Sequence, residues 1–85
     1  MTEREERVAA EILRIAREDL RLSGAPPDPA APLAGQLDSL ALLSLVVAVE
    51  DRFRIALADD DAARTQSLAD LARLVAARAD PEALP

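Results

Sequence analysis

Apolar residues recur at helical spacing along this chain, and a cluster of prolines separates the first helical segment from the second. Charged residues alternate with the apolar positions of the first segment, which are Val8, Ile12, Ile15, Ala16 and Leu20. Thr2 and Glu5 form a capping-box pattern, in which each side chain accepts a hydrogen bond from the other residue's amide. The sequence therefore predicts a helix over residues 3–22 that Ser23 and Gly24 end.

The proline cluster lies directly after this predicted helix. It consists of Pro26, Pro27, Pro29 and Pro32. Because proline lacks an amide hydrogen, the cluster excludes a regular ladder and predicts a long loop over residues 23–38. Leu33 and Leu37 are the large apolar residues of this loop, and we expect them to pin it onto the core, since a free loop of this length is unusual in a small domain.

A nearly unbroken apolar run follows Asp38. The short Asp38 side chain can accept a hydrogen bond from a free amide of the first turn, so the sequence predicts a second helix over residues 39–53. At 100° per residue, one face of this helix is suited to a core. That face consists of Leu42, Leu45, Val46, Val49 and Phe53.

Two further helices are predicted toward the C-terminus. Acidic residues 59–61 stabilise the start of a helix and predict a short one over residues 59–64. Ser67 and Asp70 repeat the capping-box pattern and predict a final helix over residues 68–79. Its apolar stripe consists of Leu68, Leu71, Leu74 and Val75.

The amino-acid composition agrees with a helical fold. Phe53 is the one aromatic residue, so the core is built from aliphatic side chains, which favours packed helices over a sheet. A chain of 85 residues forms one domain. We expect an all-α four-helix bundle with three long helices, a short third helix and the long Pro-rich loop, and a frayed tail over residues 81–85.

Composition also excludes several functions. The chain has no His, Cys, Lys, Trp or Tyr, which removes the usual general base, thiol nucleophile, Schiff-base amine and zinc ligands, so we expect neither an enzyme nor a metal site. A net charge of -6 disfavours nucleic-acid binding. The N-terminus lacks the layout of a signal peptide and no apolar run is long enough to span a bilayer, so we expect a cytoplasmic protein without a membrane segment.

The helix predicted over residues 39–53 has a second apolar stripe, formed by Leu40, Leu43 and Val47, nearly opposite the core face. Polar residues border this stripe on both sides; they are Ser39, Ser44, Glu50 and Asp51. An exposed patch of this kind is typical of a docking site for another protein. The alternatives are that the stripe packs under the short third helix or the Pro-rich loop, or forms the seam of a homodimer.

Ser39 occupies the first position of the same helix. Free amides and the positive end of the helix dipole favour a phosphate ester there. Because no His or Lys is present to take its proton, Ser39 is expected to be modified by another enzyme rather than to act as a nucleophile.

These features resemble the acyl carrier protein family. Leu37-Asp38-Ser39-Leu40, opening an apolar helix in a short acidic chain, is similar to the family's attachment motif. Glu5-Glu6-Arg7-Val8 is similar to the family's first helix, Glu50-Asp51-Arg52-Phe53-Arg54-Ile55 to the end of its second, and Ser67-Leu68-Ala69-Asp70-Leu71 to the start of its last. The resemblance implies a carrier domain over residues 1–80.

The resemblance also implies how such a chain acts. Ser39 would receive a 4'-phosphopantetheine arm from coenzyme A through a phosphopantetheinyl transferase, with Asp38 beside it, and the arm would carry acyl groups as thioesters. Loading, condensing or ligase enzymes would be the partners of a monomeric carrier in fatty acid, polyketide or other specialised biosynthesis. The residues that would meet them are Asp38, Leu40, Leu43, Val47, Glu50, Asp51 and Leu57.

The chain departs from the family pattern near the serine. Gln36 stands where the family often has Gly, and Ala41 and Ser44 are neutral where fatty acid carriers are commonly acidic, so docking is expected to depend more on apolar contact. A start at Met1 favours a free-standing carrier. Two alternatives remain: an aminoacyl or peptidyl carrier of nonribosomal peptide synthesis, and an unmodified helical adaptor that uses only the outer stripe.

Overall fold

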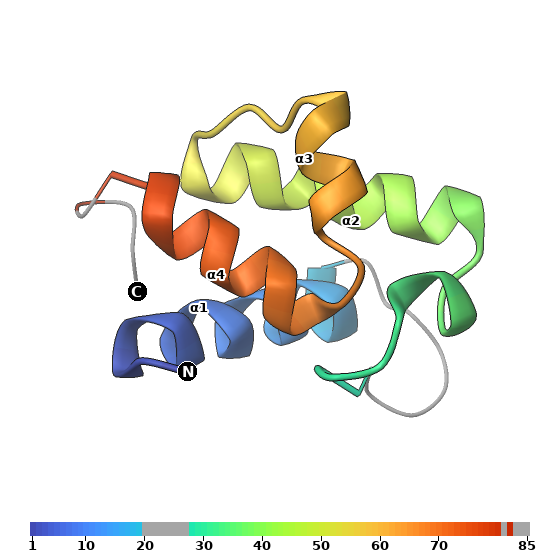
Figure 1. Cartoon of the computed structure of the whole chain (residues 1–85), viewed down its shortest axis with the longest axis horizontal. Helices are drawn as coiled ribbons and strands as arrows, with labels where there is room; N and C mark the ends of the chain where they lie inside the picture. The colour runs from blue at the N-terminus through green and yellow to red at the C-terminus, as the bar shows by residue number, and fades with distance from the viewer. Residues whose placement is uncertain (20–27, 81, 83–85) are drawn as a thin grey trace.

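The computed structural model describes residues 1–19, 28–80 and 82, and within these ranges the chain is mostly helical, with four α-helices and no strand (Figure 1). In chain order the elements are α1 (Glu3–Arg14), a π-helix η1 (Ile15–Asp19), a 3-10 helix η2 (Leu33–Gly35), α2 (Ser39–Phe53), α3 (Asp59–Arg64) and α4 (Leu68–Arg78). None of the helices in the described ranges is long and apolar enough to cross a bilayer.

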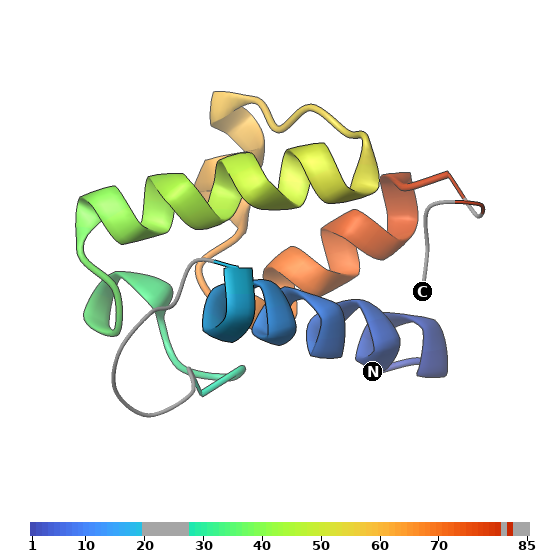
Figure 2. The same cartoon turned by 180° about the vertical axis from the view of Figure 1, so that it is seen from behind.

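The three longer α-helices form the body of the molecule. Both α2 and α4 run in the direction opposite to α1, and α1 packs against α4 (Figures 1 and 2). The short helix α3 stands across α2, and the chain enters α2 at the end of the molecule where η2 lies (Figure 1). This arrangement places the start of α2 at one end of the structure.

A single apolar core holds these elements together. Its fully buried large side chains come from α1, η1, α2 and α4; they are Val8, Ile12, Ile15, Leu45, Val49, Phe53, Leu68 and Val75. Leu33 of η2 is also buried. The core face expected for α2 is therefore present, with Leu42 and Val46 only partly buried at its edge. Close packing of such side chains supplies most of the stability of a helical domain of this size.

The first helix differs from the expected uninterrupted α-helix. The α-helical pattern ends at Arg14 and continues as the π-helix η1 to Asp19, and the rest of the expected helix lies outside the described residues. A π-turn is wider than an α-turn and shifts the faces on which successive side chains lie. The consecutive residues Ile15 and Ala16 are both buried there.

Side-chain caps fix the starts of three helices where the sequence places them. Thr2 and Glu5 form the capping box of α1, and Ser67 and Asp70 form that of α4. The carboxylate of Asp38 accepts a hydrogen bond from the Ala41 amide at 2.7 Å. Each cap satisfies amides that the helix itself leaves without acceptors.

The described part of the proline-rich segment, residues 28–38, is folded onto the body of the molecule. Leu33 is buried and Leu37 is half-buried against the core, as expected for the two pinning residues. The Leu33 amide donates to the carbonyl of Gln66 at 2.7 Å, which joins this segment to the start of α4. Ser23, Gly24, Pro26 and Pro27 lie outside the described residues.

Candidate functional site

The site is built on the first turn of α2, where Ser39 and Asp38 are both exposed. Asp38 caps the Ala41 amide with its side chain and accepts the Leu42 amide with its carbonyl at 2.9 Å. The amides of Ser39 and Leu40 have no acceptor among the described residues. An exposed hydroxyl beside free amides at the positive end of a 15-residue helix is a favourable place for a phosphate ester.

The chain lacks the residue types that most often activate a serine hydroxyl. The chain contains no His, Lys or Cys, so no base of these types can activate the hydroxyl. The described ranges also contain no cluster of three or more metal-ligating side chains.

The outer face of α2 carries an exposed apolar patch, which we call the outer patch and define as Leu40, Leu43 and Val47. Leu40 is 75% exposed, Leu43 60% and Val47 48%. Apart from Met1, these are the exposed large apolar side chains of the described residues. In this structure the outer patch is not covered by α3 or by the described part of the proline-rich segment, contrary to the alternative that it is buried within the fold.

The other expected docking residues differ from one another in their surroundings. Asp51 is exposed on α2. Glu50 is half-buried, and its carboxylate accepts a hydrogen bond from the Leu57 amide at 2.8 Å. The Leu57 side chain is itself half-buried against the core. Glu50 and Leu57 thus hold the segment between α2 and α3 in place, and Asp51 is the freer of the two acids to meet a partner.

An apolar groove of about 460 Å³ opens between α2 and the segment that leads into α3. Ser39 is among the residues that line it, and most of the other lining residues are aliphatic. From α2 these are Leu42, Leu43, Val46, Val47 and Glu50; from the rest of the chain they are Leu33, Leu57, Ala58, Asp59, Thr65 and Leu71. The groove and the outer patch share Leu43 and Val47, so the serine, the groove and the patch form one continuous surface.

The wall of the groove formed by α3 is held by an ion pair that sequence reasoning missed. Asp61 of α3 is 5% exposed and binds Arg78 of α4 through both carboxylate oxygens. Hydrogen bonds from Arg78 and from the Ala58 amide lower the pKa of Asp61 to about 2. In the sequence, Asp61 is one of three consecutive aspartates, and nothing local distinguishes it from Asp59 or Asp60.

Gln36 is a second residue whose role the sequence did not show. Its side-chain amide accepts a hydrogen bond from the Asp28 amide and donates to three backbone carbonyls between residues 28 and 32. The sequence shows Gln36 where the family often has Gly, but it does not predict the hydrogen-bond partners of the Gln36 side chain.

Comparison with known protein families gives a match over most of the chain. Residues 8–75 match a family model described as a phosphopantetheine attachment site. No curated protein and no solved structure matches the chain. The matched range includes Ser39, the outer patch and all residues that line the groove.

Proposed function

Because the chain belongs to the phosphopantetheine attachment-site family, whose model matches most of its length, we propose that Ser39 is the residue to which 4'-phosphopantetheine is attached. The cofactor of this domain is 4'-phosphopantetheine, and the domain is a carrier of the acyl or peptidyl type. Domains of this family are in general not catalytic and interact with phosphopantetheinyl transferases and biosynthetic enzymes. The single observation that carries the assignment to Ser39 is its exposed place at the capped start of α2.

The residues around Ser39 fit such a group. The hydroxyl is accessible, the adjacent amides of the first turn favour the negative charge of a phosphodiester, and Asp38 holds that turn in helical geometry. When bound, the group supplies the thiol on which an acyl cargo is carried, which the chain itself lacks because it has no cysteine. The part of this chain is to present the serine, to leave the group accessible and to bind the enzymes that use it.

The groove beside Ser39 favours an acyl cargo over an aminoacyl one. Its lining is mainly aliphatic and includes Ser39. Apolar surface that leaves water on binding stabilises a complex by about 25 cal/mol per Å². The proposed function is therefore a carrier in fatty acid, polyketide or a related specialised biosynthesis, rather than an aminoacyl or peptidyl carrier.

The outer patch supports a docking role on the same side of the helix. Leu40, Leu43 and Val47 are exposed on the helix that Ser39 begins, and Asp51 is exposed farther along the same helix. We expect partner enzymes to present an apolar depression to Leu40, Leu43 and Val47 and a basic group to Asp51.

The test of the proposed function is intact-protein mass spectrometry after incubation with coenzyme A and a broad-specificity phosphopantetheinyl transferase. The wild-type chain should gain the mass of one 4'-phosphopantetheine group, and Ser39→Ala should gain none. Ser44→Ala is the matched control, because Ser44 lies in the same helix, and it should be modified like the wild type. Modification of Ser39→Ala, or a wild-type chain that stays unmodified, refutes the assignment.

The exposed outer patch also supports a second candidate, an adaptor that binds other proteins without being modified. This candidate requires that partner binding be independent of Ser39. It would be favoured by a wild-type chain that binds a biosynthetic enzyme through α2 yet is never modified by any transferase.

A further inference from the structure

The side chain of Gln36 closes the segment that leads into the first turn of α2. Its oxygen accepts a hydrogen bond from the Asp28 amide at 2.6 Å. Its nitrogen lies 3.2 Å from the carbonyl oxygens of Asp28 and Ala31 and 3.3 Å from that of Pro32. One side chain therefore joins both ends of the segment formed by residues 28–36.

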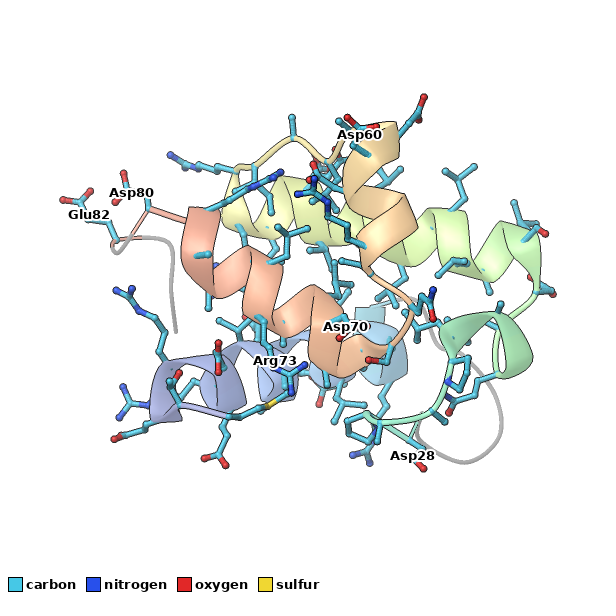
Figure 3. The ribbon with its side chains drawn as sticks, viewed as in Figure 1. Asp28, Asp60, Asp70, Arg73, Asp80 and Glu82 are labelled. Atoms are coloured by element: carbon cyan, nitrogen blue, oxygen red, sulfur yellow. The ribbon has the colours of Figure 1, made fainter. Side chains whose placement is uncertain are left out.

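The same segment is attached to the body of the molecule on its other side. The Leu33 amide donates to the Gln66 carbonyl at 2.7 Å, and the Ala69 amide donates to the Pro29 carbonyl at 2.9 Å. The Leu33 side chain is buried in the core. The segment is thus anchored to the start of α4 and closed on itself by Gln36; Figure 3 shows Asp28 at its beginning, on the side of the molecule away from α3.

The first turn of α2 has few buried side chains of its own, so its position depends in part on this segment. The fully buried residues of α2 are Leu45, Val49 and Phe53, which begin in the second turn, and Leu42 is the large side chain of the first turn that packs, partly buried, against the core. In the first turn, Leu40 is 75% exposed, and Asp38 and Ser39 are also exposed. The Leu37 amide donates to the Leu33 carbonyl at 2.9 Å. Because Leu37 directly precedes the cap residue Asp38, the position of the segment affects the position of Asp38.

We propose that Gln36 is a positioning residue for the modification of Ser39. Its amide keeps residues 28–36 closed and so holds Asp38 and Ser39 in the orientation that a phosphopantetheinyl transferase requires. This inference rests on the proposed attachment at Ser39. In that transfer the bond between the Ser39 oxygen and phosphorus forms while the pyrophosphate bond of coenzyme A breaks, adenosine bisphosphate leaves, and the hydroxyl proton passes to the transferase.

Positioning of this kind affects the rate through the geometry of the reacting oxygen. A displacement of about 1 Å can cost up to about a hundredfold in rate when the reacting atoms must meet in line. Gln36 supports the site from a distance of a few residues, so we expect Gln36→Ala to lower kcat/KM for modification of the carrier by about tenfold. The KM for coenzyme A should not change, because we expect residues 28–36 of the carrier to take no part in the binding of coenzyme A to the transferase.

The experiment compares Gln36→Ala with Gln66→Ala in two measurements on the full chain. Gln66 is the matched control, because it is exposed and only its backbone takes part in the hydrogen bonds described. Hydrogen exchange of the Asp28, Leu33 and Leu37 amides reports whether the segment has opened, and transferase kinetics report the modification rate. Circular dichroism and urea unfolding establish that each variant is folded.

We expect faster exchange at these amides and a lower kcat/KM in Gln36→Ala, and no change in either for Gln66→Ala. Gln36→Glu should also lower kcat/KM, because a carboxylate can still accept from the Asp28 amide but cannot donate to the three carbonyls. Asp28→Ala removes the hydrogen bond from the Ala30 amide to the Asp28 carboxylate, at 3.0 Å, and loosens the same segment without touching Gln36. Its effect on the rate should be less than additive with that of Gln36→Ala.

Two results would overturn the inference. A segment that opens with no loss of modification rate means that its geometry is irrelevant to Ser39. A lower rate with unchanged exchange means that Gln36 contacts the transferase directly. A wild-type chain that is not modified at all is a different result, which contradicts the attachment at Ser39 itself.

Discussion

Asp61 of α3 and Arg78 near the end of α4 form a bidentate ion pair, with nitrogen–oxygen distances of 2.5 and 2.6 Å. The Asp61 carboxylate also accepts the Ala58 amide at 2.9 Å, and its backbone carbonyl accepts the Thr65 hydroxyl at 2.9 Å. One aspartate therefore joins both ends of the short helix α3 to α4. Since Ala58 and Asp59 line the groove beside Ser39, this ion pair also holds one wall of the proposed cargo site.

This ion pair should make stability depend on pH in the acidic range. Arg78 and the Ala58 amide lower the pKa of Asp61 from 3.8 to about 2. A carboxylate with a lowered folded-state pKa stabilises the fold above its unfolded pKa, and this contribution is lost as the pH falls from about 4 toward 2. Asp61→Asn should lower the urea midpoint at pH 7, and its difference from the wild type should shrink below pH 4.

The control for this prediction is Asp60→Asn. Asp60 lies next to Asp61 in the same helix, but it is exposed and points away from the body of the molecule (Figure 3). Its substitution should leave the urea midpoint nearly unchanged at every pH. An equal effect of the two substitutions would show that helix charge, and not the ion pair, sets the pH dependence.

The two faces of α2 should respond very differently to the same substitution. Leu45 is fully buried, so Leu45→Ala should cost about 2–5 kcal/mol in the free energy of unfolding. Leu40 is 75% exposed, so Leu40→Ala should change it by less than about 0.5 kcal/mol. Urea unfolding followed by circular dichroism measures both. A large loss of stability in Leu40→Ala would mean that the outer patch is buried in solution.

The C-terminal end of α2 can be made more stable. Arg54 caps this end in the left-handed conformation, with φ of 55° and ψ of 49°. A residue with a Cβ atom is strained there by roughly 1 kcal/mol, whereas glycine adopts this conformation freely. Arg54→Gly should therefore raise the free energy of unfolding by about 0.5–1 kcal/mol. Arg54→Ala, which keeps the Cβ atom, should give no such gain.

Substitutions in the outer patch and at Ser39 should have different effects on the binding of a partner enzyme. Val47 is 48% exposed, so Val47→Glu should leave the fold intact but place a charge in the proposed apolar interface. We expect it to weaken binding of the transferase by at least about tenfold, because an unpaired charge buried in an interface is costly. Calorimetric titration of the folded variants measures this effect.

Ser39→Ala provides the comparison. It should bind the transferase nearly as well as the wild type while being unable to accept the 4'-phosphopantetheine group. Normal binding and normal modification of Val47→Glu would show that partners do not use the outer patch.

Much of the fold could be predicted from neighbouring residues. The caps formed by Thr2, Asp38 and Ser67 lie at the helix starts that the sequence indicated, because a cap depends on residues two or three positions apart. The two faces of α2 could also be separated from periodicity alone. The sequence did not show the change to a π-helix after Arg14, since the α and π patterns bring similar apolar residues toward the core.

Part of the site could be predicted in the same way. The position of Ser39 at a helix start predicts it as a candidate site, and the apolar residues opposite the core face predict the outer patch. The groove could not be predicted, because its lining comes from α2, η2, the segment before α3 and α4. Which of these elements meet depends on packing between residues far apart in the chain.

Neighbouring residues thus indicate where the helices begin, which faces are apolar and which serine stands at a helix start, because these properties depend on short-range geometry. Only the folded chain shows that Asp61, and neither Asp59 nor Asp60, is buried in an ion pair with Arg78, that Gln36 bonds across the segment before Ser39, and that a groove lies beside that serine. Each of these features depends on backbone or side-chain groups that folding brings together. The residue types nearby in the sequence do not predict which groups will meet.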